Sequence, residues 1–149
     1  MTAPAPRLPS SVAVGSGASR GRRVGLAVEF LWFLVGGIAH FVATDLEMRI
    51  VPPAVPWPRA AVWVSGAFEL LGAAGLLWRP TRRAAGYGLF ALTVAVTPAH
   101  FYMLQRPELF GVPYWALVLR LPVQVALLAL IAWSTAPVHC RARPPTPPR

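Results

Sequence analysis

The chain has 149 residues, which is the length of a single domain. Hydrophobic residues make up 56% of it and charged residues only 13%, whereas an ordinary soluble domain carries about 25% charged residues. This composition excludes an ordinary water-soluble protein and predicts a surface that faces lipid.

The charge of the chain is strongly basic, with 14 basic against 5 acidic residues and a formal net charge of +9. Every basic residue is an arginine. The arginines lie in short flanks between apolar runs, not along a polar helix or an aromatic-studded sheet. The pattern therefore argues against a nucleic-acid-binding protein and is typical of loops that border membrane spans.

Cysteine chemistry is limited to one residue, Cys140. Without any C-x-x-C motif, a disulfide scaffold, a thiolate zinc site and thioredoxin-type chemistry are all excluded. Cys140 closely follows an apolar run, so palmitoylation is one interpretation. An inert thiol is the simpler one.

Residues 1–23 are rich in Pro, Gly, Ser and Ala and end in a cluster of arginines. This composition predicts a disordered basic tail. The alternative is a signal peptide. The apolar run that follows is too long for one, contains Glu29 and His40, and lacks a clean cleavage site, so we expect the segment to be retained.

Four apolar runs follow, over residues 24–43, 60–78, 84–104 and 114–133. Each is close to the roughly 20 residues that a helix needs to cross a hydrocarbon core, and tryptophans and tyrosines mark the run ends as in an aromatic belt. The sequence predicts an all-α integral membrane protein, a four-helix transmembrane bundle over residues 24–135. A Pro- and Arg-rich tail over residues 136–149 completes the chain.

The arginine distribution predicts the orientation of this bundle. In a four-span chain both tails and the turn at residues 79–83 share one side, and that side holds ten arginines. The other side holds three, Arg49, Arg59 and Arg106. The positive-inside rule then places both termini in the cytoplasm.

The longer outer connection, residues 44–59, reads TDLEMRIVPPAVPWPR. Its prolines forbid regular helix in the second half, so we expect an extended lid anchored by tryptophan on the membrane surface. Asp45 and Glu47 are expected to be solvated there. The second outer connection, residues 105–113, is also interrupted by prolines.

Six strongly polar residues interrupt the apolar runs: Glu29, His40, Glu69, His100, Arg120 and Gln124. With a rise of about 1.5 Å per residue, all but Glu29 fall in the outer half of the membrane, and every helix contributes. Glu29 lies near the inner face, where we expect it to snorkel or to pair with Arg82 or Arg83.

His40 and Glu69 are flanked at three and four positions by small residues. Such faces are where transmembrane helices approach closely, so both side chains should face the bundle interior. An unpaired charge at the depth of Arg120 costs at least ~2.5–3.5 kcal/mol. We therefore predict an ion pair between Arg120 and Glu69, with Gln124 and a histidine satisfying the remaining polar groups.

Pro98 and Pro122 lack an N–H and leave the carbonyls of Val94 and Val118 without a helical donor. Kinks there would widen the outer half of the bundle beneath the lid. The sequence thus predicts a ligand pocket whose polar residues are His40, Glu69, His100, Arg120 and Gln124. The alternative is that the ion pair only fixes helix pairing and the cluster binds nothing.

Two histidines at matching depth also raise the hypothesis of a bis-imidazole haem in a four-helix bundle. Two histidines alone support it weakly. A metal site is no better supported, because the nearby carboxylate of Glu69 already has an arginine to pair with. We therefore predict no metal site, and quinone is the one cofactor candidate.

Three blocks between Leu34 and Trp133 occur in the order RIVPPAVPWPRAAVWVSGAFELLGAAGLLWRPTRRAAGYGL, VTPAHFYML and LRLPVQ. In them the chain resembles the DoxX-like family of small bacterial four-helix membrane proteins. The family-like positions are His40, Phe41, Pro52, Pro53, Pro56, Ser65, Gly66, Glu69, Pro98, Ala99, Arg120, Leu121, Pro122 and Gln124.

At one position the chain departs from this family, which usually has asparagine where His100 stands. The departure argues against a family-wide bis-histidine haem and for a hydrogen-bonding role at this position. The resemblance implies the bacterial inner membrane and a link to quinone-coupled sulfur and thiol oxidation. The missing C-x-x-C motif excludes a self-contained thiol-to-quinone relay.

The function predicted on these grounds is that of a quinone- or lipid-binding membrane subunit of a redox or stress-response system. His40 or His100 would donate to a quinone carbonyl, Glu69 would carry protons, and Arg120 would set the charge of Glu69. The expected partners are the bilayer and a redox protein or a second copy of the chain. The alternatives are a non-catalytic membrane scaffold and, less favoured for want of an internal repeat, a small-solute transporter.

Overall fold

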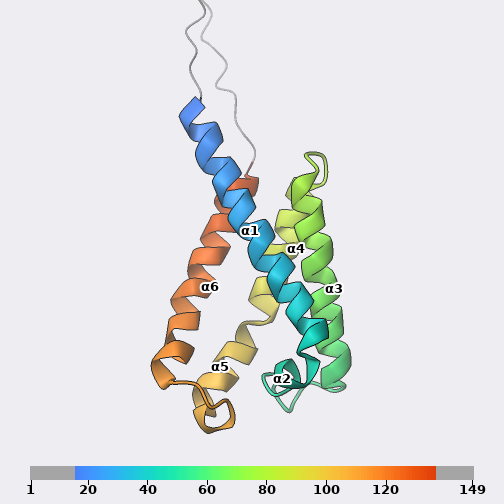
Figure 1. The fold of residues 1–149 in the computed structure, drawn as a ribbon, viewed down its shortest axis with the longest axis vertical. Coiled ribbons are helices and arrows are strands. Elements are labelled where there is room, and N and C mark those ends of the chain that lie inside the picture. Colours follow the sequence, from blue (N-terminus) through green and yellow to red (C-terminus); the bar gives the residue numbers. More distant parts are fainter. Residues whose placement is uncertain (1–15, 137–149) are drawn as a thin grey trace, which may run out of the picture.

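The computed structural model describes residues 16–136, and these fold into helices and connecting turns (Figure 1). Residues 1–15, the rest of the C-terminal tail and Cys140 lie outside the described residues. In chain order the elements are α1 (Ser16–Val42), α2 (Thr44–Met48), α3 (Pro58–Leu77), α4 (Arg82–Ala95), α5 (Thr97–Gln105), the 3₁₀ helix η1 (Pro107–Leu109) and α6 (Tyr114–Thr135).

Four helical segments are long and apolar enough to cross a membrane: Arg20–Val42, Pro58–Leu77, Arg82–Gln105 and Tyr114–Thr135. They coincide with the predicted runs, so the all-α fold and its apolar helices are confirmed. Many large apolar side chains point outward; Val35, Leu71 and Val125 are 66%, 68% and 65% exposed. Such a surface suits a hydrocarbon environment.

The first helix starts earlier than predicted, because residues 16–23, assigned to the flexible tail, belong to α1. Arg22 explains part of this extension. Its guanidinium donates to the carbonyl of Trp133 at 3.3 Å and to that of Ala136. Carbonyls in the last turn of α6 have no helical donor of their own, so Arg22 caps α6 and joins it to the start of α1.

The predicted third helix is divided at Val96 into α4 and α5. Pro98, at which a kink was predicted, has no N–H for the preceding turn, and the division lies two residues before it. The fourth helix behaves differently, because α6 continues through Pro122 as one helix.

A close helix contact joins α1 and α3 at Gly37 and Gly66. A Cβ built on Gly66 would lie 2.6 Å from the Cβ of His40, and one on Gly37 would lie 2.8 Å from the side chain of Leu70. Real Cβ atoms do not approach so closely. The small residues around His40 and Glu69 therefore mark a close helix crossing, as predicted.

The four long helices form a wedge (Figure 1). We call the end with the α3–α4 turn and the C-terminal end of α6 the narrow end, and the end with α2 and η1 the wide end. At the narrow end α1 and α6 are joined. Toward the wide end α6 and α5 diverge from α1 and α3, and α5 packs mainly against α6. The apolar core comprises Phe33, Ala73, Leu76, Leu89, Leu127 and Ile131.

The lid, residues 44–57, covers the wide end beside α3. Its first half is the helix α2 and its second half consists of turns and bends, so the expectation of an extended lid was wrong. Two contacts hold α2 to α3: Trp63 Nε1 donates to Thr44 Oγ1 at 3.1 Å, and Arg59 pairs with Asp45 at 3.5 Å.

Candidate functional site

A cavity of about 460 Å³ lies at the wide end, enclosed by α1, α3, α4, α5, α6 and the lid. Its lining includes every polar residue predicted for the pocket: His40, Glu69, His100, Arg120 and Gln124. Residues from four separate helices thus meet around one space. Whether they bind a ligand stays a prediction.

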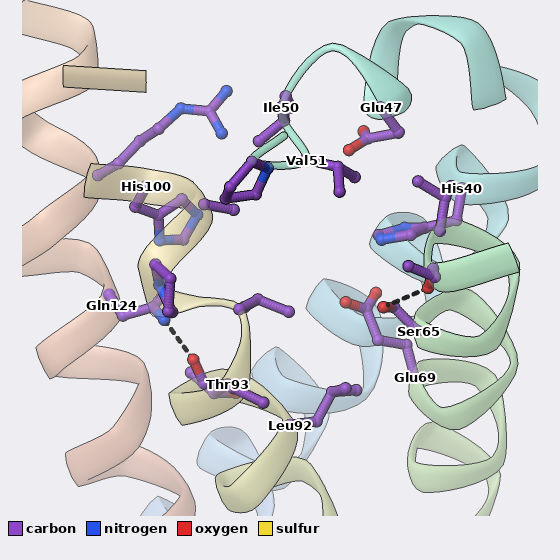
Figure 2. Close-up of a pocket in the computed structure, with 18 of the residues that line it drawn as sticks. His40, Glu47, Ile50, Val51, Ser65, Glu69, Leu92, Thr93, His100 and Gln124 are labelled. Carbon is purple, nitrogen blue, oxygen red and sulfur yellow. Dashed lines mark hydrogen bonds between the residues drawn. The ribbon is translucent and has the colours of Figure 1, made fainter. Parts of the chain in front are cut away.

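One side of the cavity, the acidic wall, comprises His40 from α1, Glu47 from α2 and Glu69 from α3 (Figure 2). The Glu69 carboxyl is packed against α1, where a Cβ on Gly36 would lie 2.7 Å from its Oε2. His40 Nδ1 lies 2.8 Å from the carbonyl of Gly36. A carbonyl only accepts, so Nδ1 carries the proton and Nε2 is left for a ligand.

The facing side, the basic wall, comprises His100 from α5 and Arg120 from α6. Figure 2 shows His100 across the cavity from His40 and Glu69. The Nδ1 atom of His100 is buried and has no hydrogen-bond partner. Arg120 lies within electrostatic range of His100 and supplies the positive charge of this wall.

The predicted ion pair between Arg120 and Glu69 is not formed. The ion pairs within residues 16–136 are Arg59–Asp45 and Arg106–Glu108, both on the surface. The helices explain this difference. Glu69 is packed against α1, whereas Arg120 is on α6, which diverges from α1 and α3 at the wide end (Figure 1). The two charges therefore stand on opposite walls with the cavity between them.

Gln124 lines the cavity, but its amide group is engaged in the fold. Its Nε2 donates to the carbonyl of Thr93 at 2.5 Å and to Thr97 Oγ1 at 3.0 Å, as Figure 2 shows for Thr93. These contacts bridge the division between α4 and α5. Gln124 was predicted to satisfy polar groups of the Arg120–Glu69 pair, but its amide instead binds the backbone and a hydroxyl at the α4–α5 division.

Glu29 lies outside the cavity and is completely buried at 0% exposure. Ser134 Oγ donates to its Oε1 at 2.7 Å, while Oε2 has no partner. The expectation of snorkelling or pairing with Arg82 or Arg83 was wrong. Arg82 instead donates through Nε to the carbonyl of Leu76 at 2.9 Å, and Arg83 is exposed.

Sequence reasoning missed Glu47, which was expected to be solvated and instead lines the cavity, half-buried. Ile50 and Val51 of the lid lie beside it (Figure 2). Thr44 and Glu47 are three residues apart in the first half of the lid, which precedes the prolines and is free to form a helical turn. A helical turn at this point places both residues on one face, and that face is turned toward the bundle.

The described residues hold no group of three or more His, Cys, Asp or Glu side chains arranged to bind a metal ion. The carboxyl oxygens of Glu47 and Glu69 on the acidic wall can accept hydrogen bonds. The acidic wall suits a ligand that carries hydrogen-bond donors.

Comparison with known proteins gives one match. Residues 30–136 match the family described as Domain of unknown function (DUF8561). Neither a search of curated proteins nor a search of solved structures found a match. The matched range contains both walls of the cavity and the lid, and it covers most of the sequence. The chain therefore belongs to the DUF8561 family.

Proposed function

We propose that this protein is a multi-pass membrane protein that binds a quinone- or lipid-like molecule in the cavity at its wide end. It would act as a membrane subunit of a redox or stress-response system, which is what the resemblance to DoxX-like proteins implies. One observation carries the binding proposal: a 460 Å³ cavity in which charged side chains from separate helices face one another unpaired. Small-molecule sites typically occupy about 300–1,000 Å³.

A lipid-soluble ligand is favoured over a water-soluble one by the apolar part of the lining. Trp32 and Phe33 of α1 and Leu127 of α6 line the cavity toward the narrow end, where the two helices converge (Figure 1). Trp32 is 52% exposed on the outer surface. One lining residue of the cavity therefore also reaches the surface that would face lipid.

In a quinone site the two walls would have different tasks. His100 and Arg120 would donate to one carbonyl oxygen of the ring. His40 and Glu69 would hold or release the proton that accompanies a change in redox state at the other oxygen. Electrons would come from a partner protein, since a subunit of this kind supplies binding and protons.

The orientation belongs to the same proposal. Ten arginines on the side of the termini against three on the other favour both termini in the cytoplasm. The cavity would then lie in the outer half of the bilayer, beneath a lid on the outer surface.

The proposal is tested by mass spectrometry of the small molecules that co-purify with the protein in mild detergent. We expect a quinone or a specific lipid with the unmodified chain and its loss in Glu69→Ala. Glu108→Ala, which removes an exposed carboxylate outside the cavity, serves as the control and should retain the ligand. Nothing beyond bulk phospholipid in the unmodified protein would contradict the proposal.

A scaffold that recruits a partner is the second candidate, and a specific observation favours it. Gln124 and Glu29 show that intramembrane polar residues here can serve helix packing alone. Transport is not proposed, because the apolar cluster of Phe33, Leu76, Leu89, Leu127 and Ile131 is packed in the interior and its members are buried. It leaves no continuous path to the narrow end.

A further inference from the structure

The cavity has an unusual charge arrangement that says more about its ligand. The basic wall presents Arg120 and the unpartnered Nδ1 of His100. The acidic wall presents the carboxyl groups of Glu47 and Glu69 and the free Nε2 of His40. Opposite charges face each other across the space without contact, because the ion pairs of the described chain lie elsewhere.

Charges held apart in this way would be neutralised together only by a ligand that carries one positive and one negative group. A charge in the membrane interior that lacks a partner is costly, and water in a narrow space compensates it incompletely. A neutral quinone would satisfy donors on one wall but brings no positive group for the carboxyls. A simple anion would satisfy Arg120 and leave the acidic wall unpaired.

The shape of the cavity adds a second requirement, an apolar tail. The charged walls lie at the wide end, whereas Trp32, Phe33 and Leu127, about two helical turns nearer the narrow end on α1 and α6, make the lining apolar there. A molecule that filled both parts would have a polar head of two charges and an apolar chain leaving between these helices. That is the form of a zwitterionic phospholipid.

The acidic wall also distinguishes between ammonium types. A primary ammonium has N–H donors that match carboxyl oxygens and an imidazole nitrogen. A quaternary ammonium has none and is recognised by aromatic cages. The residues of the lid and α3 that accompany the acidic wall are Ile50, Val51, Pro52, Val55, Ala61 and Val62, none of them aromatic.

We infer that the cavity binds a phospholipid whose headgroup carries a phosphate and a primary ammonium, as in phosphatidylethanolamine. The phosphate contacts Arg120 and His100, and the ammonium contacts Glu47 and Glu69. The acyl chains leave between α1 and α6. This inference rests on the proposed function and narrows it, since it chooses one class from the quinone- and lipid-like ligands.

The test is native mass spectrometry of protein released from nanodiscs that contain equal parts of phosphatidylethanolamine, phosphatidylglycerol and phosphatidylcholine, with ubiquinone added. We expect phosphatidylethanolamine to be retained about tenfold over each of the other lipids, the ratio that a difference of about 1.4 kcal/mol gives. Arg120→Gln should lose all lipid retention. Glu69→Gln should lose the preference over phosphatidylglycerol while still retaining a phosphate-bearing lipid.

The control is Arg106→Gln, which removes a surface guanidinium that pairs with Glu108 outside the cavity; it should behave as the unmodified protein. Helical content of each variant is followed by circular dichroism, and Glu47→Gln replaces Glu69→Gln if the latter fails to fold. Water-soluble glycerophosphoethanolamine is added as a competitor. Displacement by this headgroup alone would overturn the need for acyl chains.

The outcomes separate this inference from the broader proposal. Equal retention of phosphatidylcholine or phosphatidylglycerol would overturn recognition of the ammonium. Retention of ubiquinone alone would overturn the inference and leave the proposed function standing. Retention of nothing specific would overturn both.

Discussion

Glu29 and Ser134 form a hydrogen bond between two buried side chains. The carboxyl is 0% exposed and receives one hydrogen bond of 2.7 Å from the hydroxyl. Removing one member of a buried polar pair leaves the other unsatisfied, whereas replacing both by apolar groups is often nearly neutral. The contact therefore contributes to the choice of helix partners more than to net stability.

Ser134→Ala should lower the free energy of unfolding by about 1–3 kcal/mol, because the Glu29 carboxyl would lose its only observed donor. The double variant Glu29→Leu/Ser134→Ala should be closer to the unmodified protein than Ser134→Ala alone. Thermal unfolding in one detergent, followed by circular dichroism, measures both. Additive losses in the double variant would show that the two side chains do not act as a pair.

Gln124→Glu should destabilise the protein by about 1–3 kcal/mol, since it replaces the donor to the Thr93 carbonyl by an acceptor. The change nearly preserves volume, so packing is not disturbed. Gln105→Glu, at an exposed position at the end of α5, is the matched control and should have no measurable effect. Unfolding in a denaturant series distinguishes the two variants, and equal midpoints would contradict the bridging role of Gln124.

At the same scale, the sequence predicted which polar residues would gather but not how they would pair. Residue type and spacing placed His40, Glu69, His100, Arg120 and Gln124 near one depth, and all line one cavity. The pairing of Arg120 with Glu69 failed because it depends on how far α6 stands from α3. The contact of Glu29 with Ser134 joins residues 105 positions apart, and no local pattern shows it.

At the scale of the helices, α1 and α3 cross closely where both carry glycines. Gly66→Ala would bring a methyl group within 2.6 Å of the His40 Cβ, a backbone-proximal atom that cannot rotate away. We expect a loss of stability of about 1–3 kcal/mol, typical of overpacking. Gly88→Ala adds the same methyl where nothing lies within 4 Å, so its melting temperature should be unchanged or higher.

Gly36→Ala is a different kind of probe of the same crossing. The atom that its methyl would meet is Oε2 of Glu69, 2.7 Å away, the end of a flexible side chain that can move aside. The protein should fold normally while the Glu69 carboxyl is displaced within the cavity. Loss of the preference for the co-purifying ligand at unchanged melting temperature is the expected result, and an unchanged preference would exclude a role for that carboxyl's position.

The boundaries of the helices could not all be predicted from the local sequence. Pro98 and Pro122 have the same chemistry, yet the chain divides at Val96 and runs on through Pro122. The difference arises from tertiary contacts, because Gln124 and Thr97 both donate to the Thr93 carbonyl at the division. The early start of α1 has a similar origin in the contact of Arg22 with the end of α6.

For the whole molecule, the number of apolar helices followed directly from run lengths near 20 residues and is confirmed. The orientation stays a prediction. A reporter that is active only in the cytoplasm, fused after residue 149, should be active, and one active only outside should be silent. Replacing two arginines of the α3–α4 turn by glutamine, in Arg79→Gln/Arg83→Gln, should weaken the preference for cytoplasmic termini. A C-terminal reporter active only outside would refute the proposed topology.

The wedge shape has a mechanical consequence. The narrow end is held by Arg22, by the Glu29–Ser134 contact and by the apolar core. At the wide end the lid packs against α3. In a bilayer, a body of this form would have a larger cross-section in one leaflet than in the other. Lateral pressure in that leaflet would push α6 toward α1. Denser lipid packing would therefore close the cavity, and looser lipid packing would open it. Occupancy of the cavity would thereby report the packing state of one side of the bilayer.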